Sequence, residues 1–336
     1  MNWYLQSGKD SDVVISTIVR YARNFKNYKF GITNKDDADK IEEYVKSKLP
    51  NLGYNLHLFR IQDMDDLTKM SLLEKNIINT NCVNDKNGIC DILINDEQNI
   101  CIVLNEQEHI NLQVFSGGFE LNETFNLAKE IDKKIEDNFD IAKSEKYGYL
   151  TNKLTDVGTG MKVSVIVHLP GLIKTGNIRK VLESVSDFGL NIKGIYVENG
   201  KISDDMYQIS NKQTLGITED NIIKNVKIIT EKIIEQERTA RRILAKNQIE
   251  LEDMVYRSFG ILSNCKKISL EETRNILSDV KLGTDLGIIK EITDNKILEI
   301  YLYSKPANLQ KKVGQNLDVY DRDIKRAEII KEIIKK

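Results

Sequence analysis

The chain has 336 residues, 40% of them hydrophobic and 30% charged, a length sufficient for two domains with separate cores. Its 49 Lys and Arg against 51 Asp and Glu give a formal net charge of −2, which argues against general nucleic-acid binding, although a local basic patch is compatible with it. No apolar run approaches the ~20 residues of a membrane span, and the first residues lack a signal-peptide pattern. Four cysteines without CxxC spacing predict reduced thiols in the cytoplasm and no zinc site (Cys82, Cys90, Cys101, Cys265).

The first two-thirds of the chain mixes strand and helix patterns. Residues rich in Val and Ile, mostly bounded by polar or Gly residues, predict strands at 12–17, 91–95, 100–105, 161–169 and 192–198. Helical patterns lie between them at 36–48 and 121–137, and residues 92–104 predict a hairpin around 95–99. Because the strands and helices do not alternate regularly, we predict an α+β fold with an antiparallel sheet flanked by helices.

The pattern turns helical from about Thr218. Apolar residues recur at helical spacing from Ile222 to Ile233, and Ser269 with Glu272 has the pattern of a capping box. Residues 321–335 predict a terminal amphipathic helix. We place the boundary near 215–240, with a first domain over 1–225 and an α-helical domain over 226–336.

Residues 147–170 contain the frame YLT-x-x-x-T-x-VGTG. This frame resembles the central active-site segment of the ATP:guanidino phosphotransferases, most closely that of the bacterial protein-arginine kinases. Lys153 stands where the resemblance places a cysteine beside the guanidinium substrate, and a cation there repels that substrate. Lys162 replaces an ATP-phosphate arginine, keeping its charge but losing its bidentate fork, while Ser164 matches the serine of the same motif.

Residues 15–25 resemble the family motif S-S-R-x-R-x-A-R-N, whose two leading arginines hold the ATP phosphates. Ser16 and Thr17 occupy its first two positions, Ile18 replaces the first arginine, and Arg20 retains the second. Taken alone, an arginine at a strand end is more often a surface charge.

Residues 104–113 resemble the motif NEEDH-x-R. Gln107 occupies the position of a catalytic glutamate, and an amide cannot accept a proton as a base, a role typically worth ~10²–10⁴ in rate. Asn111 replaces a phosphate-binding arginine, and His109 by itself is more often a structural histidine. Glu108 is the nearest substitute carboxylate, but on a regular strand it faces away from its neighbour.

Residues 193–216 resemble a fourth motif whose tail, YQISN and TLG, is well kept. Lys193 replaces an arginine, and the second catalytic carboxylate aligns with Lys201. If the alignment with the motif shifts by one or two residues, other nearby carboxylates become candidates for this position: Glu198, Asp204 and Asp205.

The resemblance implies a kinase that uses ATP and Mg²⁺, without the GxxxxGK[ST] of a P-loop. Because both acceptor carboxylates and the cysteine are changed, we predict a pseudokinase or a weakly active enzyme. One alternative is an active protein-arginine kinase that uses Glu106, Glu108 or Glu198 instead. Another is a nucleotide sensor that binds ATP without turnover, through Arg20, Lys162 and Lys193.

The helical part also resembles the protein-arginine kinases, over residues 236–262 and 268–289. Its last helix carries RDIKRA, which matches the RDxxRA motif that binds phosphoarginine in that family. Arg322 and Arg326 are four residues apart and share a helix face, so their forks can grip a phosphate, and Asp323 can pair with a guanidinium. The simpler alternative is a solvated basic helix.

The resemblance further implies work in phosphoarginine recognition or stress-response protein quality control. The partners it implies are arginine-phosphorylated proteins, a kinase activator, and a Clp-type ATPase or heat-shock repressor. We expect a cytoplasmic homodimer that binds neither membranes nor nucleic acid directly.

Overall fold

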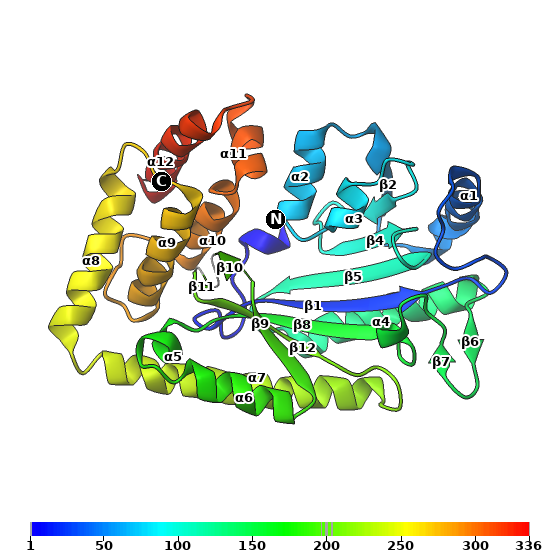
Figure 1. Cartoon of the computed structure of the whole chain (residues 1–336), viewed down its shortest axis with the longest axis horizontal. Helices are drawn as coiled ribbons and strands as arrows, with labels where there is room; N and C mark the ends of the chain where they lie inside the picture. The colour runs from blue at the N-terminus through cyan, green and yellow to red at the C-terminus, as the bar shows by residue number, and fades with distance from the viewer. Residues whose placement is uncertain (1, 196, 199–200, 203, 336) are drawn as a thin grey trace.

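The computed structural model describes residues 2–195, 197–198, 201–202 and 204–335. Eight antiparallel strands form a central sheet in the order β2-β3-β4-β5-β1-β8-β12-β9 (Figure 1). Along that order they span His57–Arg60, Asp91–Ile94, Ile100–Leu104, Ile110–Gly117, Val14–Arg23, Met161–His168, Met206–Asn211 and Leu190–Gly194. The predicted α+β fold with an antiparallel sheet is therefore confirmed.

The predicted hairpin is present, since β3 and β4 pair from Asp91 opposite Leu104 to Ile94 opposite Cys101. Three of the predicted strands are each one residue shorter than expected, and two differ by more. β1 continues to Arg23, well past residue 17. The strand predicted over 192–198 is wrong as one element, because β9 ends at Gly194 and Val197–Glu198 (β10) pairs instead with Lys201–Ile202 (β11). A further small hairpin joins Lys143–Ser144 (β6) to Gly148–Tyr149 (β7).

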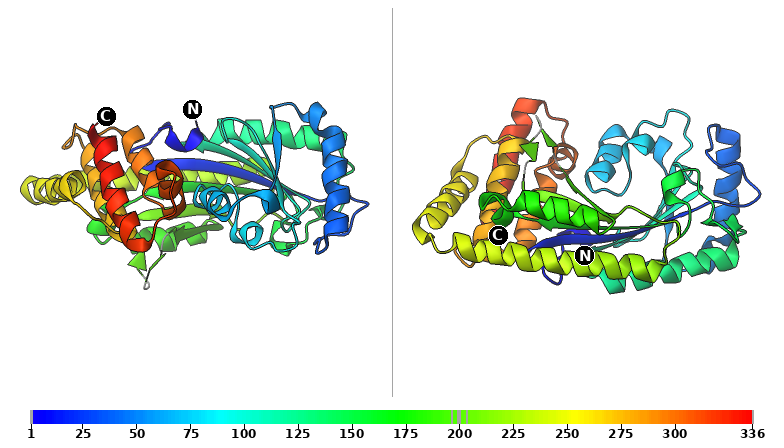
Figure 2. Two further views of the ribbon diagram at one scale, coloured as in Figure 1. Left: turned by 90° about the horizontal axis from the view of Figure 1, so that it is seen from above. Right: turned by 60° about the horizontal axis from the view of Figure 1, so that its bottom comes forward.

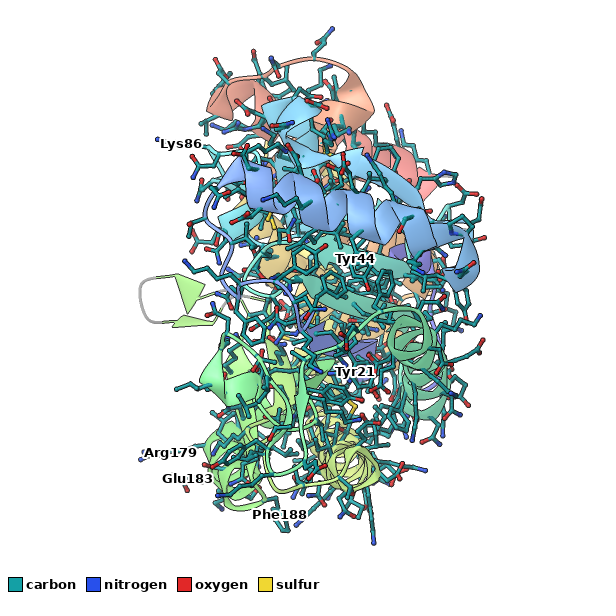
Figure 3. All side chains as sticks on the ribbon, turned by 90° about the vertical axis from the view of Figure 1, so that its right-hand side faces the viewer. Tyr21, Tyr44, Lys86, Arg179, Glu183 and Phe188 are labelled. Carbon is teal, nitrogen blue, oxygen red and sulfur yellow. The ribbon has the colours of Figure 1, made fainter. Side chains whose placement is uncertain are left out.

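One face of the sheet packs on long helices. Helices α4 (Leu121–Asn138) and α7 (Glu219–Leu244) cover it, and α1 (Lys35–Leu52) packs against α4 (Figure 2). Alternate strand residues such as Val19 and Tyr21 enter this main core, and Figure 3 shows Tyr21 in the interior of the molecule. The short helices α5 (Pro170–Lys174) and α6 (Ile178–Asp187) follow β8, and Arg179 and Glu183 of α6 lie at the outer edge in Figure 3.

The other face is only partly covered. At the β2–β5 end lie two 3₁₀ turns, η1 (Trp3–Leu5) and η2 (Ile61–Asp63), with α2 (Asp66–Glu74) and α3 (Thr80–Val83). They bury a second, smaller core that includes Trp3, stacked on Phe115 with ring centroids 4.8 Å apart. The middle strands of this face carry polar residues instead.

Five helices follow α7: α8 (Gln248–Asn264), α9 (Leu270–Asp285), α10 (Asp294–Tyr303), α11 (Pro306–Val313) and α12 (Val319–Lys335). They have a hydrophobic core of their own. The amide of Glu272 donates to Ser269 Oγ over 3.1 Å, which is the hydroxyl half of the predicted capping box. The boundary expected between 225 and 226 lies inside α7, whose buried face belongs to the main core as far as Ala240.

Buried polar groups join the helical part to the sheet. Arg241 of α7 binds Glu237 (2.7 Å) and Asp285 of α9 (3.0 Å), and it donates to the carbonyl of Asp12 (2.9 Å). Nearer α2, the carboxylate of Glu74 accepts from the first amides of α11, Ala307 and Asn308. None of the described helices is long and apolar enough to cross a membrane.

Candidate functional site

The partly covered sheet face carries most of the predicted nucleotide-binding residues, of which Ser16 and Ser164 are buried. Arg20 of β1 lies directly opposite Lys162 of β8, so both side chains leave the same face. Because side chains alternate along a strand, Ser16 and Ser164 share that face. Lys193 of β9 does too, since it lies opposite Gln208 of β12, which in turn lies opposite Ile166, four residues after Lys162 on β8. Thr17 has the opposite orientation: it is fully buried, and its hydroxyl donates to the carbonyl of Gly118 over 2.8 Å. Thr17 therefore supports the backbone behind this face.

Arg20 already has a carboxylate partner. Its Nη2 lies 2.6 Å from Oδ2 of Asp156, a buried residue in the 3₁₀ turn η3 (Leu154–Asp156). The amide of Asp156 donates to the carbonyl of Lys153 over 2.9 Å, so Lys153 and Asp156 belong to one turn. Sequence reasoning missed Asp156; the signal was a carboxylate inside a frame of phosphate-binding residues.

Glu108 holds the turn that carries Lys153. It is 2% exposed, and its two oxygens accept from the amides of Asn152 (2.7 Å) and Lys153 (2.9 Å) and from the Asn24 side chain. Its carboxylate thus points at the backbone below Lys153.

His109, the next residue, is structural. Its Nδ1 accepts from the amide of Phe25 over 3.0 Å, and its Nε2 lies 2.8 Å from the carbonyl of Lys29. Burial lowers its pKa below the usual value, so the ring is neutral at pH 7.

Glu106 is the carboxylate that faces open space. Its oxygens accept from the side chains of Asn81 (2.9 Å) and Asn111 (3.1 Å). Together with Arg20, Asn111 and Gln113 it lines a cavity of ≈ 350 Å³ beside α2 and α3. Gln107 is partly exposed in the adjoining loop between β4 and β5.

The remaining acceptor candidates lie elsewhere. Lys201 and Glu198 belong to the β10–β11 hairpin, and their side chains lie outside the described part of the structure. Asp205 accepts from Ser278 of α9 over 2.7 Å. Asp204 is 1% exposed and makes no hydrogen bond of normal geometry; it lines a separate, largely apolar cavity between the sheet and the helical part. Neither aspartate is among the residues that line the Arg20 cavity.

The RDxxRA residues are not equivalent. Arg326 is 2% exposed and bonds to the carbonyls of Ser304 (2.7 Å) and Ile268 (2.8 Å) and to Asp323 Oδ1 (2.6 Å). Arg322 is only partly buried. The structure therefore separates one anchored arginine from one that solvent reaches.

The cations on this face form a donor set that suits phosphate groups. Arg20, Lys162 and Lys193 present three cations on one face, a combination that attracts polyanions such as a phosphate chain. Among the described residues, no group of three or more His, Cys, Asp or Glu is placed to hold a metal ion.

Comparison with known families agrees with this geometry. The model of the ATP:guanido phosphotransferase C-terminal catalytic domain matches residues 39–240, and that of the protein-arginine kinase McsB C-terminal domain matches residues 248–336. The chain belongs to the protein-arginine kinase family. Curated relatives named protein-arginine kinase include one from Bacillus velezensis, 40% identical over 98% of this chain and 92% of the relative. Another, from Bacillus subtilis strain 168, is 38% identical over 98% and 92%.

Solved structures show the same fold for the kinase-like part. The duplicated taurocyamine kinase from Schistosoma mansoni, with transition-state-analogue components bound, has a TM-score of 0.60 and 25% identity; the match covers 68% of this chain and 33% of that one. Lombricine kinase has a TM-score of 0.59 and 20% identity, over 68% of this chain and 67% of that one. The resemblance predicted from sequence is confirmed at the level of family and fold.

Proposed function

We propose that this protein-arginine-kinase-like chain does not phosphorylate arginine by the usual guanidino-kinase mechanism and acts instead by binding phosphoarginine. The observation that carries the proposal is the use of Glu108. The residue adjoining the altered catalytic position has both carboxylate oxygens bound to the turn that presents Lys153. The end of the site where the arginine substrate would bind therefore presents the cation Lys153. The family has groups there that bind the positively charged guanidinium.

Phosphoryl transfer to a guanidinium requires a base. It also requires arginines that are not paired with a carboxylate and can therefore bind the phosphoryl group. Gln107 cannot take the proton, and a positioned base is worth ~10²–10⁴ in rate. Arg20 is neutralised by Asp156 at 2.6 Å, whereas arginines on a transferring phosphoryl group contribute ~10³–10⁵. These losses act on the same step, which favours a pseudokinase over an efficient enzyme.

Phosphoarginine recognition is proposed for the start of α12. Arg322 is the solvent-reached guanidinium for the phosphate, and the next residue, Asp323, is the carboxylate for the ligand's guanidinium, although one of its oxygens already pairs with Arg326 over 2.6 Å. Arg326 supports this site from behind through its bonds to Ser304 and Ile268. Partners in this proposal are arginine-phosphorylated proteins of the cytoplasmic stress response.

Calorimetric titration of the full chain with phosphoarginine tests the binding function. We expect saturable binding that Arg322→Ala reduces at least tenfold and Arg322→Lys reduces less. Lys325→Ala is the matched control, because Lys325 pairs with Glu328 at 2.7 Å on the same helix. Absence of binding, or equal losses in Arg322→Ala and Lys325→Ala, would contradict the proposal.

Incubation with Mg-ATP and a protein substrate, followed by mass spectrometry at neutral pH, tests the catalytic part. We expect no phosphoarginine from the native chain. Its formation would refute the pseudokinase proposal, whether or not phosphoarginine binds to α12.

A second candidate is an active protein-arginine kinase with Glu106 as its base. It is favoured by the partly exposed carboxylate that lines the Arg20 cavity. The γ-phosphoryl P–O bond would break, a P–N bond to arginine would form, Glu106 would take the guanidino proton, and ADP would leave. Under this candidate the native chain forms phosphoarginine and Glu106→Gln does not.

A further inference from the structure

We infer that the former acceptor end of the sheet face binds an anion: the terminal group of a condensed phosphate chain that reaches Lys153. The inference rests on the part of the proposed function that excludes arginine as acceptor, and it is independent of the phosphoarginine site on α12. The charge of the group bound at this end of the site is thereby negative, instead of the positive charge of a guanidinium.

The first observation is the arrangement of cations. Arg20 and Lys162 face each other across β1 and β8, and Lys193 lies on the same face of β9. With β12 between β8 and β9, these cations spread over three strand spacings, or about 14 Å at ~4.8 Å per spacing. An extended polyanion contacts such a row better than a single small ion does.

The second observation is that the turn bearing Lys153 is fixed in place. Glu108 accepts from the backbone amide of Lys153, and Thr151 Oγ1 donates to the carbonyl of Lys153 over 2.8 Å. From the other side, the single Thr214 hydroxyl lies within hydrogen-bond distance of two carbonyls, those of Thr155 (2.9 Å) and Val157 (2.7 Å). The side chain of Lys153 is nevertheless exposed. Its backbone is held by hydrogen bonds while its ammonium group is open to solvent.

Lys162 shows that the cations act on one another. Its pKa is lowered by burial and by the charges of Arg20, Lys153 and Lys193, while Asp156 opposes the shift. The named cations around this ammonium therefore outnumber the carboxylate that opposes them. A guanidinium meets repulsion here, whereas an anion is attracted by each of these charges.

Asp156 has the opposite effect on such a ligand. It pairs with Arg20 and adds a negative charge beside the phosphate row. An incoming phosphate has to displace Asp156 from Arg20 or tolerate its charge. Removing the Asp156 charge should therefore strengthen binding, and removing the Lys153 charge should weaken it.

Titration of the full chain with inorganic tripolyphosphate and with ATP, both without Mg²⁺, tests the inference. We expect Lys153→Met to weaken tripolyphosphate binding about tenfold and Asp156→Asn to strengthen it by several-fold. Lys146→Met is the control, because Lys146 is an exposed lysine close in sequence whose ammonium lies over the ring of Tyr147. Comparing the two ligands distinguishes an inorganic chain from a nucleotide as the source of the phosphates.

Several results would overturn the inference: no binding of either ligand, no difference between Lys153→Met and Lys146→Met, or competition by free arginine for the site. Arg322→Ala should leave tripolyphosphate binding unchanged. A loss in that variant would place the ligand on α12 and would also contradict this inference. Phosphoarginine formation by the native chain would refute the proposed function and remove the premise of this inference, whereas failure of tripolyphosphate binding alone would refute only this inference.

Discussion

Arg326 donates from Nη1 to Oδ1 of Asp323 over 2.6 Å, one turn earlier on α12, while its other bonds tie this helix to two carbonyls from elsewhere in the helical part. The amide of Ile268 in turn donates to the carbonyl of Asp323 over 3.1 Å. The last helix is thus fastened to the residues preceding α9 and to the joint between α10 and α11. Arg326 is a structural anchor, whatever Arg322 binds.

Replacing Arg326 should therefore unfold the helical part more readily. Arg326→Ala leaves Asp323 and two carbonyls without their partner, and breaking such a buried pair costs ~3–5 kcal/mol. Arg322→Ala, at a partly exposed position, should change the free energy of unfolding by less than ~1 kcal/mol. Urea unfolding followed by circular dichroism measures both, and equal losses would contradict the anchor role.

The RDxxRA motif shows how far sequence reasoning reaches. The i,i+4 spacing correctly places Arg322 and Arg326 near each other on α12, but their burial depends on Ile268 and Ser304, which no local pattern connects to them. The same holds for Asp156 and Arg20, separated by more than a hundred residues and joined only through the sheet. Strand patterns predicted the antiparallel sheet and the β3–β4 hairpin because side-chain alternation is local, whereas the split between β9 and β10 depends on pairing partners.

Glu108 offers a test of the turn that presents Lys153. In Glu108→Gln one oxygen becomes an amide donor that faces the donating amides of Asn152 and Lys153, so one or both of these bonds is lost. We expect amide hydrogen exchange over residues 151–157 to speed up at least tenfold. Glu145→Gln, an exposed residue nearby, is the control, and unchanged exchange in Glu108→Gln would show that the turn does not need this carboxylate.

Arg241 should govern the attachment of the helical part to the sheet. Arg241→Met leaves Glu237 and Asp285 with one cation fewer at a site where all three side chains are at most 3% exposed. We expect a loss of ~3–5 kcal/mol in the free energy of unfolding, together with faster proteolysis near residues 244–248. Arg242→Met is the exposed control on the same helix, and a loss of similar size there would argue against the network.

The raised pKa of the buried carboxyl group of Asp204 predicts that the stability of the protein depends on pH. Burial raises its pKa from the ordinary 3.8 to about 8, although Arg274, the amide of Met206 and Lys305 oppose the shift. The folded chain therefore keeps a proton between about pH 4 and pH 8 that the unfolded chain has released, so this group lowers stability increasingly as pH rises through that window. Asn tolerates the left-handed backbone at this position (φ 65°), so Asp204→Asn removes the ionisable group without adding strain.

The expected result is a variant about as stable as the native chain near pH 4 and more stable at pH 8 by up to about 5 kcal/mol, because each unit by which folding raises the pKa costs about 1.4 kcal/mol above that pKa. Urea unfolding of both proteins at several pH values measures the difference. Asp63→Asn, at an exposed aspartate, should show no such trend. A constant difference between Asp204→Asn and the native chain across the window would mean that Asp204 titrates alike in the folded and unfolded states.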